Sequence, residues 1–217
     1  MKAFEIAKKD LRIEFRTKGT LNLMILFALI TSMMFSVSIP VSLAERTAPS
    51  LLWLVFLFVG MLGYSRAFLR EVETETLDGL KISPIAPTSV LIGKIIYNLV
   101  LMIMIEVIVL PIFVGLFNLD VANPPLMILS ITLGNLGFVI VVSSLSILVI
   151  KSKMREMLLP VLIFPVVFPI ITSTILAVRK AISGDIVGIT SPLALISGFS
   201  IMMFVIACLT FEYAFTD

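Results

Sequence analysis

Histidine is absent from this sequence of 217 residues, and cysteine occurs once, at Cys208. Without histidine, the commonest metal ligand and the usual general base are missing from any mechanism. A single cysteine forms no intrachain disulfide, and inside an apolar run it is expected to be an ordinary small buried residue. We therefore predict no metal site in this chain.

Charged residues are scarce as well. They make up 14% of the chain, and 59% of its residues are hydrophobic, whereas a typical soluble domain is roughly 25% charged. About 20 apolar helical residues cross the ~30 Å hydrocarbon layer of a bilayer. The first uncharged run is too long for the apolar core of a secretory signal, so we expect a retained span. The sequence predicts one all-α transmembrane domain, residues 1–217, with six spans at about residues 21–44, 48–65, 95–119, 125–150, 157–178 and 188–211.

Motifs of catalysis are also missing. The sequence has no Walker glycine loop with its lysine, no CxxC and no HExxH, and no nucleophile stands beside a base. The paired glycines in "GMLGYS" and "GNLGF" lie inside apolar runs, where they favour close helix packing over phosphate binding. We expect no catalytic residue and no enzyme activity, so another chain would supply any free energy for work.

Lysine and arginine are distributed unevenly along this six-span arrangement. Thirteen of the sixteen fall on one side, and only Arg46, Arg179 and Lys180 fall on the other. Because basic residues favour the cytoplasmic side of short loops, both termini are expected in the cytoplasm.

Residues 1–18 form a basic, half-apolar segment before the first span. One stripe at helical spacing consists of Phe4, Ala7, Leu11 and Phe15, and Ile6 and Ile13 lie nearly opposite. Such a pattern is typical of an interfacial amphipathic helix on the inner leaflet. Two interpretations remain open: a solvated lead-in attracted to lipid, or an elbow that also contacts a partner subunit.

The stretch "EVETETLDGLKISPIAPTSVLIGK", residues 71–94, is the most charged in the interior of the chain. A helix over residues 69–80 would place Glu71, Glu75 and Asp78 on one face. Gly79, Pro84 and Pro87 would end it before the third span. The pattern indicates either an acidic helix that docks a basic partner or a solvated loop whose acids keep it out of the membrane.

These residues resemble a known segment. Glu71, Glu75-Thr76-Leu77, Leu80, Ser83-Pro84 and Gly93-Lys94 are similar to the cytoplasmic coupling segment of type-2 ABC exporter permeases. More narrowly, "APSLLWLVFLFVGMLGYSRAFLREVETETLDGLKISPIAP" and "EMLLPVLIFPVVFPI" resemble the CcmB family, haem exporter protein B of cytochrome c maturation. The similarity runs from about Met1 to Val178, whereas the last span matches mainly in hydropathy.

The resemblance implies a multi-pass permease of the plasma (cell inner) membrane that transmits ATP hydrolysis through Glu71, Glu75, Thr76, Leu77, Leu80, Pro84 and Lys94. Its implied partners are a CcmA-like ABC ATPase, a CcmC-like haem-handling membrane protein, a small CcmD-like membrane protein, a second copy of the chain and the lipid bilayer, but no nucleic acid. Haem is the implied substrate, ATP acts through the partner, and this chain binds no cofactor itself. Two alternatives are the permease of another type-2 exporter, for a lipid-linked sugar or drug, and a scaffold that transports nothing and relays ATPase strokes to a haem-handling partner.

Polar and proline residues inside the spans are further candidates. Glu106 interrupts the third run, and an intramembrane acid is costly unless it is neutral, paired or facing water. It is expected either to bond a neighbouring side chain such as Asn135 or to line a substrate path or dimer interface. Prolines break helical hydrogen bonds and serve as hinges or merely as kinks, and the third and fifth runs contain four of them: Pro111, Pro160, Pro165 and Pro169.

Overall fold

The computed structural model describes residues 2–73, 86–149 and 155–216. They form seven helices, and six of these are long and apolar enough to cross a membrane. The prediction of an all-α chain with six spans is therefore confirmed. The helices are α1 (Lys2–Thr17), α2 (Gly19–Ser38), α3 (Val41–Glu73), α5 (Pro87–Leu116), α6 (Pro124–Val149), α7 (Arg155–Ser183) and α8 (Thr190–Thr216).

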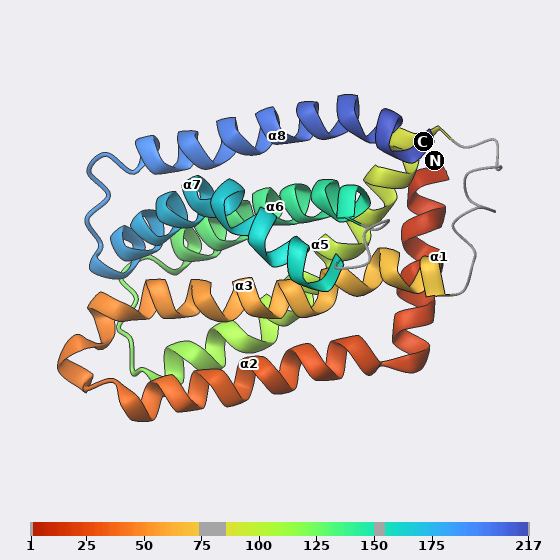
Figure 1. The fold of residues 1–217 in the computed structure, drawn as a ribbon. Helices are drawn as coiled ribbons and strands as arrows, with labels where there is room; N and C mark the ends of the chain where they lie inside the picture. The colour runs from red at the N-terminus through yellow and green to blue at the C-terminus, as the bar shows by residue number, and fades with distance from the viewer. Residues whose placement is uncertain (1, 74–85, 150–154, 217) are drawn as a thin grey trace.

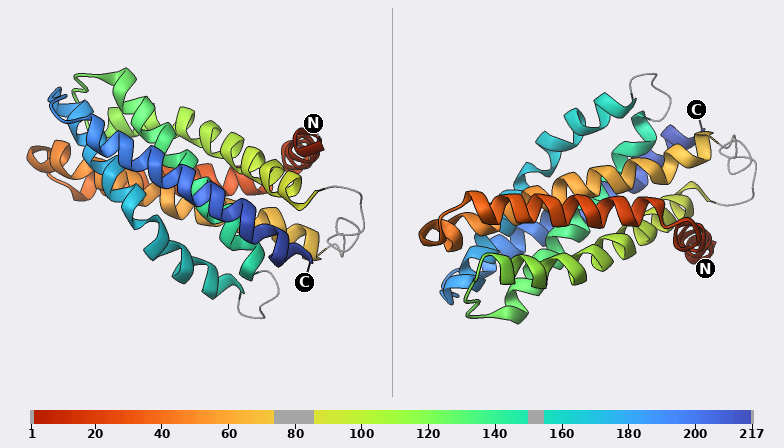
Figure 2. Two further views of the ribbon diagram at one scale, coloured as in Figure 1. Left: turned by 90° about the horizontal axis from the view of Figure 1, so that it is seen from above. Right: turned by 90° about the horizontal axis from the view of Figure 1, so that it is seen from below.

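The six long helices run side by side, and α1 crosses one end of the bundle (Figure 1). Both ends of the chain lie at that same end, as an even number of crossings requires. Figure 2 shows the same arrangement from above and below, with α1 seen nearly end-on beside the start of α5. The arrangement agrees with an N-terminal helix that lies along one membrane surface.

Proline positions account for the largest differences between predicted and observed helix ends. The first span, predicted to reach residue 44, ends at Ser38, because Ile39 is extended (φ −99°, ψ 123°) before Pro40 and the residue before a proline avoids the helical region. Residues 41–44 instead begin α3. The third span begins at Pro87 rather than at residue 95, since proline is well tolerated in a first helical turn.

The predicted helix over residues 69–80 is only partly covered by the described residues. Its first five residues, 69–73, continue α3 without a break. The remainder lies outside the described residues. The second span and the start of the acidic segment therefore form one continuous helix.

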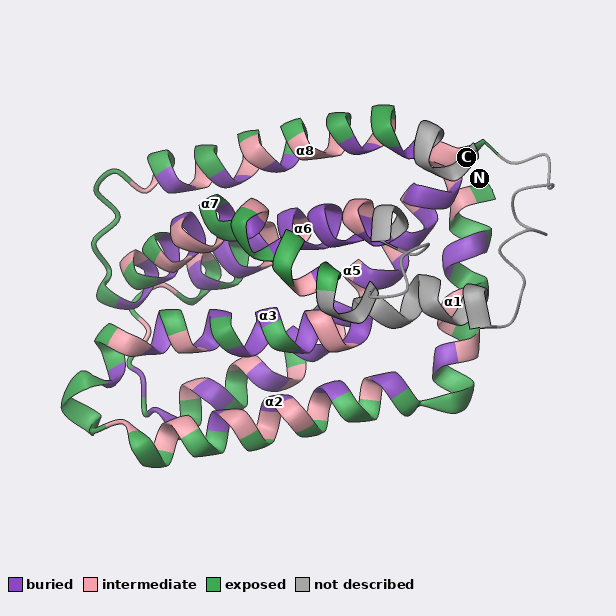
Figure 3. Cartoon of the chain, in the orientation of Figure 1, coloured by how far each residue is buried: buried purple, intermediate pink, exposed green. Residues whose placement is uncertain are grey.

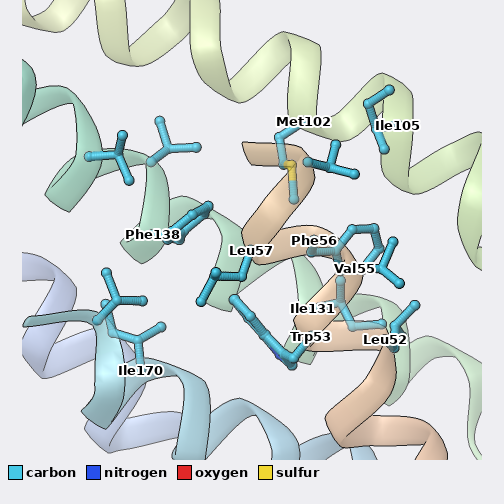
Figure 4. Packing of buried hydrophobic residues seen from close by; sticks show 14 of the residues in the cluster. Leu52, Trp53, Val55, Phe56, Leu57, Met102, Ile105, Ile131, Phe138 and Ile170 are labelled. Carbon is cyan, nitrogen blue, oxygen red and sulfur yellow. The ribbon is translucent and has the colours of Figure 1, made fainter. Parts of the chain in front are cut away.

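The centre of the bundle is built around α6, which lies against α3, α5, α7 and α8. The outward faces of α2 and α8 are largely exposed, whereas α6 is buried along most of its length (Figure 3). Trp53 of α3 and Phe138 of α6 meet edge to face, with ring centroids 6.3 Å apart. Figure 4 shows how these rings fill the space between α3, α6 and α7 together with Leu57 and Ile170.

Glycines allow the helices to approach closely, as the sequence predicted. A Cβ atom on Gly63 would lie 2.6 Å from Met24 Sδ of α2. One on Gly134 would lie 2.5 Å from Thr174 Oγ1 and 2.6 Å from Trp53 Cζ2. Both "GMLGYS" and "GNLGF" thus contain a glycine at a close contact between helices, as is common for small residues in membrane proteins.

Candidate functional site

The predicted coupling segment joins α3 to α5 at the end of the bundle that α1 crosses (Figure 1). Glu71 lies in the last turn of α3. The other predicted coupling residues before α5 lie outside the described residues: Glu75, Thr76, Leu77, Leu80 and Pro84. The structure therefore describes the end of α3 and the start of α5, the two helices that this segment connects.

α1 packs directly on the first turns of α5. A Cβ atom on Gly93 would lie 2.9 Å from the carbonyl oxygen of Ala3 and 3.0 Å from Ile6 Cβ, so glycine is needed for this approach. One helical turn further on, Ala7 is buried with Tyr97 and Leu101. α1 therefore sits on the helix that directly follows the coupling segment.

Lys94 adds an ion pair to this contact. Its Nζ lies 2.8 Å from Asp10 Oδ2, and its side chain is 0% exposed. A charge-assisted hydrogen bond of this length is among the stronger polar contacts in proteins. Lys94 is therefore buried in this structure, and Asp10 of α1 is one of its partners.

Replacing Lys94 with methionine is expected to loosen α1. The loss of a hydrogen bond between charged groups costs about 1.5–3 kcal/mol, so local opening of α1 should become roughly tenfold more frequent or more. Trypsin cleavage after the exposed Lys8, Lys9 and Arg12 measures this opening in the full chain. Lys180→Met, at the other end, serves as the control, and equal cleavage rates for wild type and Lys94→Met would contradict the expectation.

Glu14 joins α1 to the start of α2. Its Oε1 accepts hydrogen bonds from the backbone N–H of Thr20 at 2.8 Å and of Leu21 at 3.0 Å. A carboxylate at this position satisfies the free N–H groups of the helix and complements its dipole. Lys18, at the N-cap, is left-handed (φ 55°) and makes no side-chain cap bond. The sequence analysis did not single out Asp10 or Glu14. Their only signal in the sequence is that they are acidic residues in a largely basic helix.

Glu106 meets polar side chains of α6 inside the bundle. Asn135 Nδ2 donates to its Oε2 at 3.0 Å, and Thr132 Oγ1 lies 2.9 Å from its Oε1. The same Oγ1 lies 2.9 Å from the carbonyl oxygen of Ile128. A hydroxyl has one hydrogen to donate, so both Thr132 contacts are hydrogen bonds only if a neutral Glu106 donates one of them.

A second polar pair holds α5 and α6 in the same register. Asn98 Nδ2 donates to Ser143 Oγ at 3.0 Å. The two pairs lie eight residues apart on both helices, 98 to 106 and 135 to 143, which corresponds to about 12 Å along the axis. Glu106 and Asn135 are thus brought together within a packed interface between helices, and the part they play in a substrate path stays a prediction.

The four candidate hinge prolines lie inside helices. Pro111 interrupts the hydrogen bonds of α5, and Pro160, Pro165 and Pro169 interrupt those of α7. Each removes one backbone donor from its helix. The first half of α7 diverges from α8 in the left view of Figure 2 and exposes apolar side chains such as Val161 and Phe164. Their role as hinges stays a prediction.

Comparison with known proteins agrees with the resemblance seen in the sequence. No curated protein matches the chain. A protein-family model described as "CcmB protein" matches residues 1–216, which includes the last span and nearly all of the ending "TFEYAFTD". The chain therefore belongs to the CcmB family.

Proposed function

We propose that this chain is the permease subunit of an ABC complex that serves haem export or delivery during cytochrome c maturation. Membership of the CcmB family is the observation that carries the proposal. The six potential spans and the lack of an ATPase motif in the sequence support it. ATP is hydrolysed by a CcmA-like partner, and the remaining partners are CcmC-like and CcmD-like membrane proteins.

In this proposal the ATPase acts on residues 71–80 at the cytoplasmic end of the bundle. A push there reaches α3, which is continuous with Glu71, and α5, which begins at Pro87. α1 follows α5 because Gly93 and Lys94 hold it. The acidic segment would thus move two spans and the surface helix together.

Haem, as substrate, would pass between copies of the chain or along a partner. The centre of the single bundle is filled by Trp53, Phe138 and their neighbours (Figure 4). Among the described residues, close packing of this kind leaves no room for a molecule of that size within one bundle. The same packing supports the second candidate, a scaffold that relays ATPase strokes to a haem-handling partner and transports nothing.

Purification of the full chain in mild detergent, with identification of every protein that travels with it, tests the proposal. We expect an ATP-hydrolysing subunit and a haem-handling membrane protein. Reconstitution of that complex in sealed vesicles then separates permease from scaffold, since a scaffold supports ATP-dependent release of a haem chaperone without haem crossing the membrane. Full activity of the chain without any ATPase would contradict the proposal.

Glu106→Gln is expected to preserve assembly. A glutamine amide can accept from Asn135 and donate to Thr132, as a neutral carboxyl would. Glu106→Leu removes both contacts and is expected to cost about 1–2 kcal/mol of stability, a typical value for polar contacts between membrane helices. Denaturant titration of the purified variants measures the difference. Loss of function in an intact Glu106→Gln complex would instead favour a role in a substrate path.

A further inference from the structure

We propose that α1 carries a binding site for anionic phospholipid, formed by Lys8 and Arg12 between the exposed rings of Phe4 and Phe15. The site depends on the position of α1 at the membrane surface and on no other part of the proposed function.

The orientation of α1 follows from the residues it buries. Ala7 is buried against Tyr97 and Leu101 of α5, and the same cluster is packed by Leu11 and by Leu21 of α2. Since α2 and α5 are potential spans, we infer that the side of α1 that carries Leu11 faces the hydrocarbon region into which these two helices run. The Asp10–Lys94 pair and the close contact at Gly93 hold this orientation.

Two aromatic side chains project from that edge. Phe4 is 64% exposed and Phe15 is 45% exposed. Residues three or four apart on a helix lie on neighbouring positions, so Phe4, Leu11 and Phe15 form one apolar border. Aromatic rings exposed on a surface helix are typical anchors at the boundary of headgroups and acyl chains.

Lys8 and Arg12 lie next to this border, on the side facing away from the bundle. Lys8 follows Phe4 by four residues, Arg12 follows Lys8 by four, and Phe15 follows Arg12 by three, so the four side chains are neighbours along the helix. Both basic side chains are exposed, and they line a surface hollow with Glu5, Lys9 and Ile13. Neither pairs with an acid in the part of the chain that the structure describes.

This arrangement fits a lipid with a negatively charged headgroup. The rings would enter the upper acyl region, and the ammonium and guanidinium groups would lie at the level of the phosphates, where each basic residue strengthens binding to an anionic surface. The neighbouring Lys9 lies 3.3 Å from Asp10 and is already paired. Of the basic residues that line the hollow, Lys8 and Arg12 are therefore the two that provide lipid selectivity.

Native mass spectrometry of the full chain in neutral detergent tests the site, with phosphatidylglycerol and phosphatidylcholine of equal chain length as probes. We expect selective retention of phosphatidylglycerol. Lys8→Gln/Arg12→Gln should weaken its binding by about fivefold for each charge removed. Lys8→Arg/Arg12→Lys, which keeps both charges, should bind as wild type does.

Arg46→Gln/Arg179→Gln is the matched control, because it removes two exposed basic residues at the opposite end of the bundle. Its phosphatidylglycerol binding should stay within about twofold of wild type, since its charges lie far from the site. Equal retention of the two lipids, or unchanged binding in Lys8→Gln/Arg12→Gln, would overturn the proposal. So would loss of a protein partner from that variant with lipid binding intact, which would make this face a protein-docking surface.

Discussion

A chain in which Glu71 and Glu75 are both replaced by lysine is expected to reach the membrane normally and to lose the proposed partner ATPase. The two residues are four apart, on one face if the helix continues past Glu73. Reversal of charges at an interface replaces attraction to a basic partner by repulsion, which typically costs several kcal/mol. At about 1.4 kcal/mol for each factor of ten, co-purification of the ATPase should fall at least thirtyfold.

The control variant is Glu45→Lys/Asp185→Lys, which changes the net charge by the same amount at another place. Both of these acids are exposed and lie at the other end of the bundle, so this variant should keep its ATPase. Membrane insertion of both variants is checked by extraction and size-exclusion chromatography. If the Glu71→Lys/Glu75→Lys chain still carried wild-type amounts of ATPase, residues 71–80 would not be the docking segment.

Gly134→Ala is expected to destabilise the bundle, although it adds only one methyl group. The added Cβ would meet Thr174 of α7 and Trp53 of α3, both of them fully or nearly fully buried. Overpacking of a filled core costs about 1–3 kcal/mol. The thermal midpoint in detergent should therefore fall by several degrees.

Gly198→Ala is the matched control, because a Cβ there has nothing within 4 Å. That variant should be as stable as wild type or slightly more stable, since alanine is the better helix former. Equal thermal midpoints for Gly134→Ala and Gly198→Ala would show that α3, α6 and α7 are less tightly packed than the structure has them.

The number of spans could be predicted because apolar length determines it. The ends of the spans were harder to predict where the boundary of an uncharged run did not coincide with the end of a helix. Lys94 was expected to lie before the third span, yet it lies inside α5, since Asp10 neutralises its buried charge. Conversely, Pro40 ended a helix within an uncharged run.

Most contacts of the candidate site could not be predicted from the sequence. Asp10 and Lys94 are 84 residues apart in the sequence, so no local pattern could pair them. Glu14 caps a helix that begins several residues later, which no usual capping motif describes. Glu106 and Asn135 were singled out because polar residues inside spans are rare, whereas Thr132 became visible only with the register of α5 against α6.

Photo-crosslinking from position 71 in intact cells tests most directly whether ATP-driven motion enters at the end of the bundle where α1 lies. A photoreactive amino acid in place of Glu71 should capture an ATP-hydrolysing subunit, and the same group in place of the exposed Asp185 should not. Capture of only lipid or an extracytoplasmic protein from position 71, or capture of the ATPase from position 185, would contradict the account.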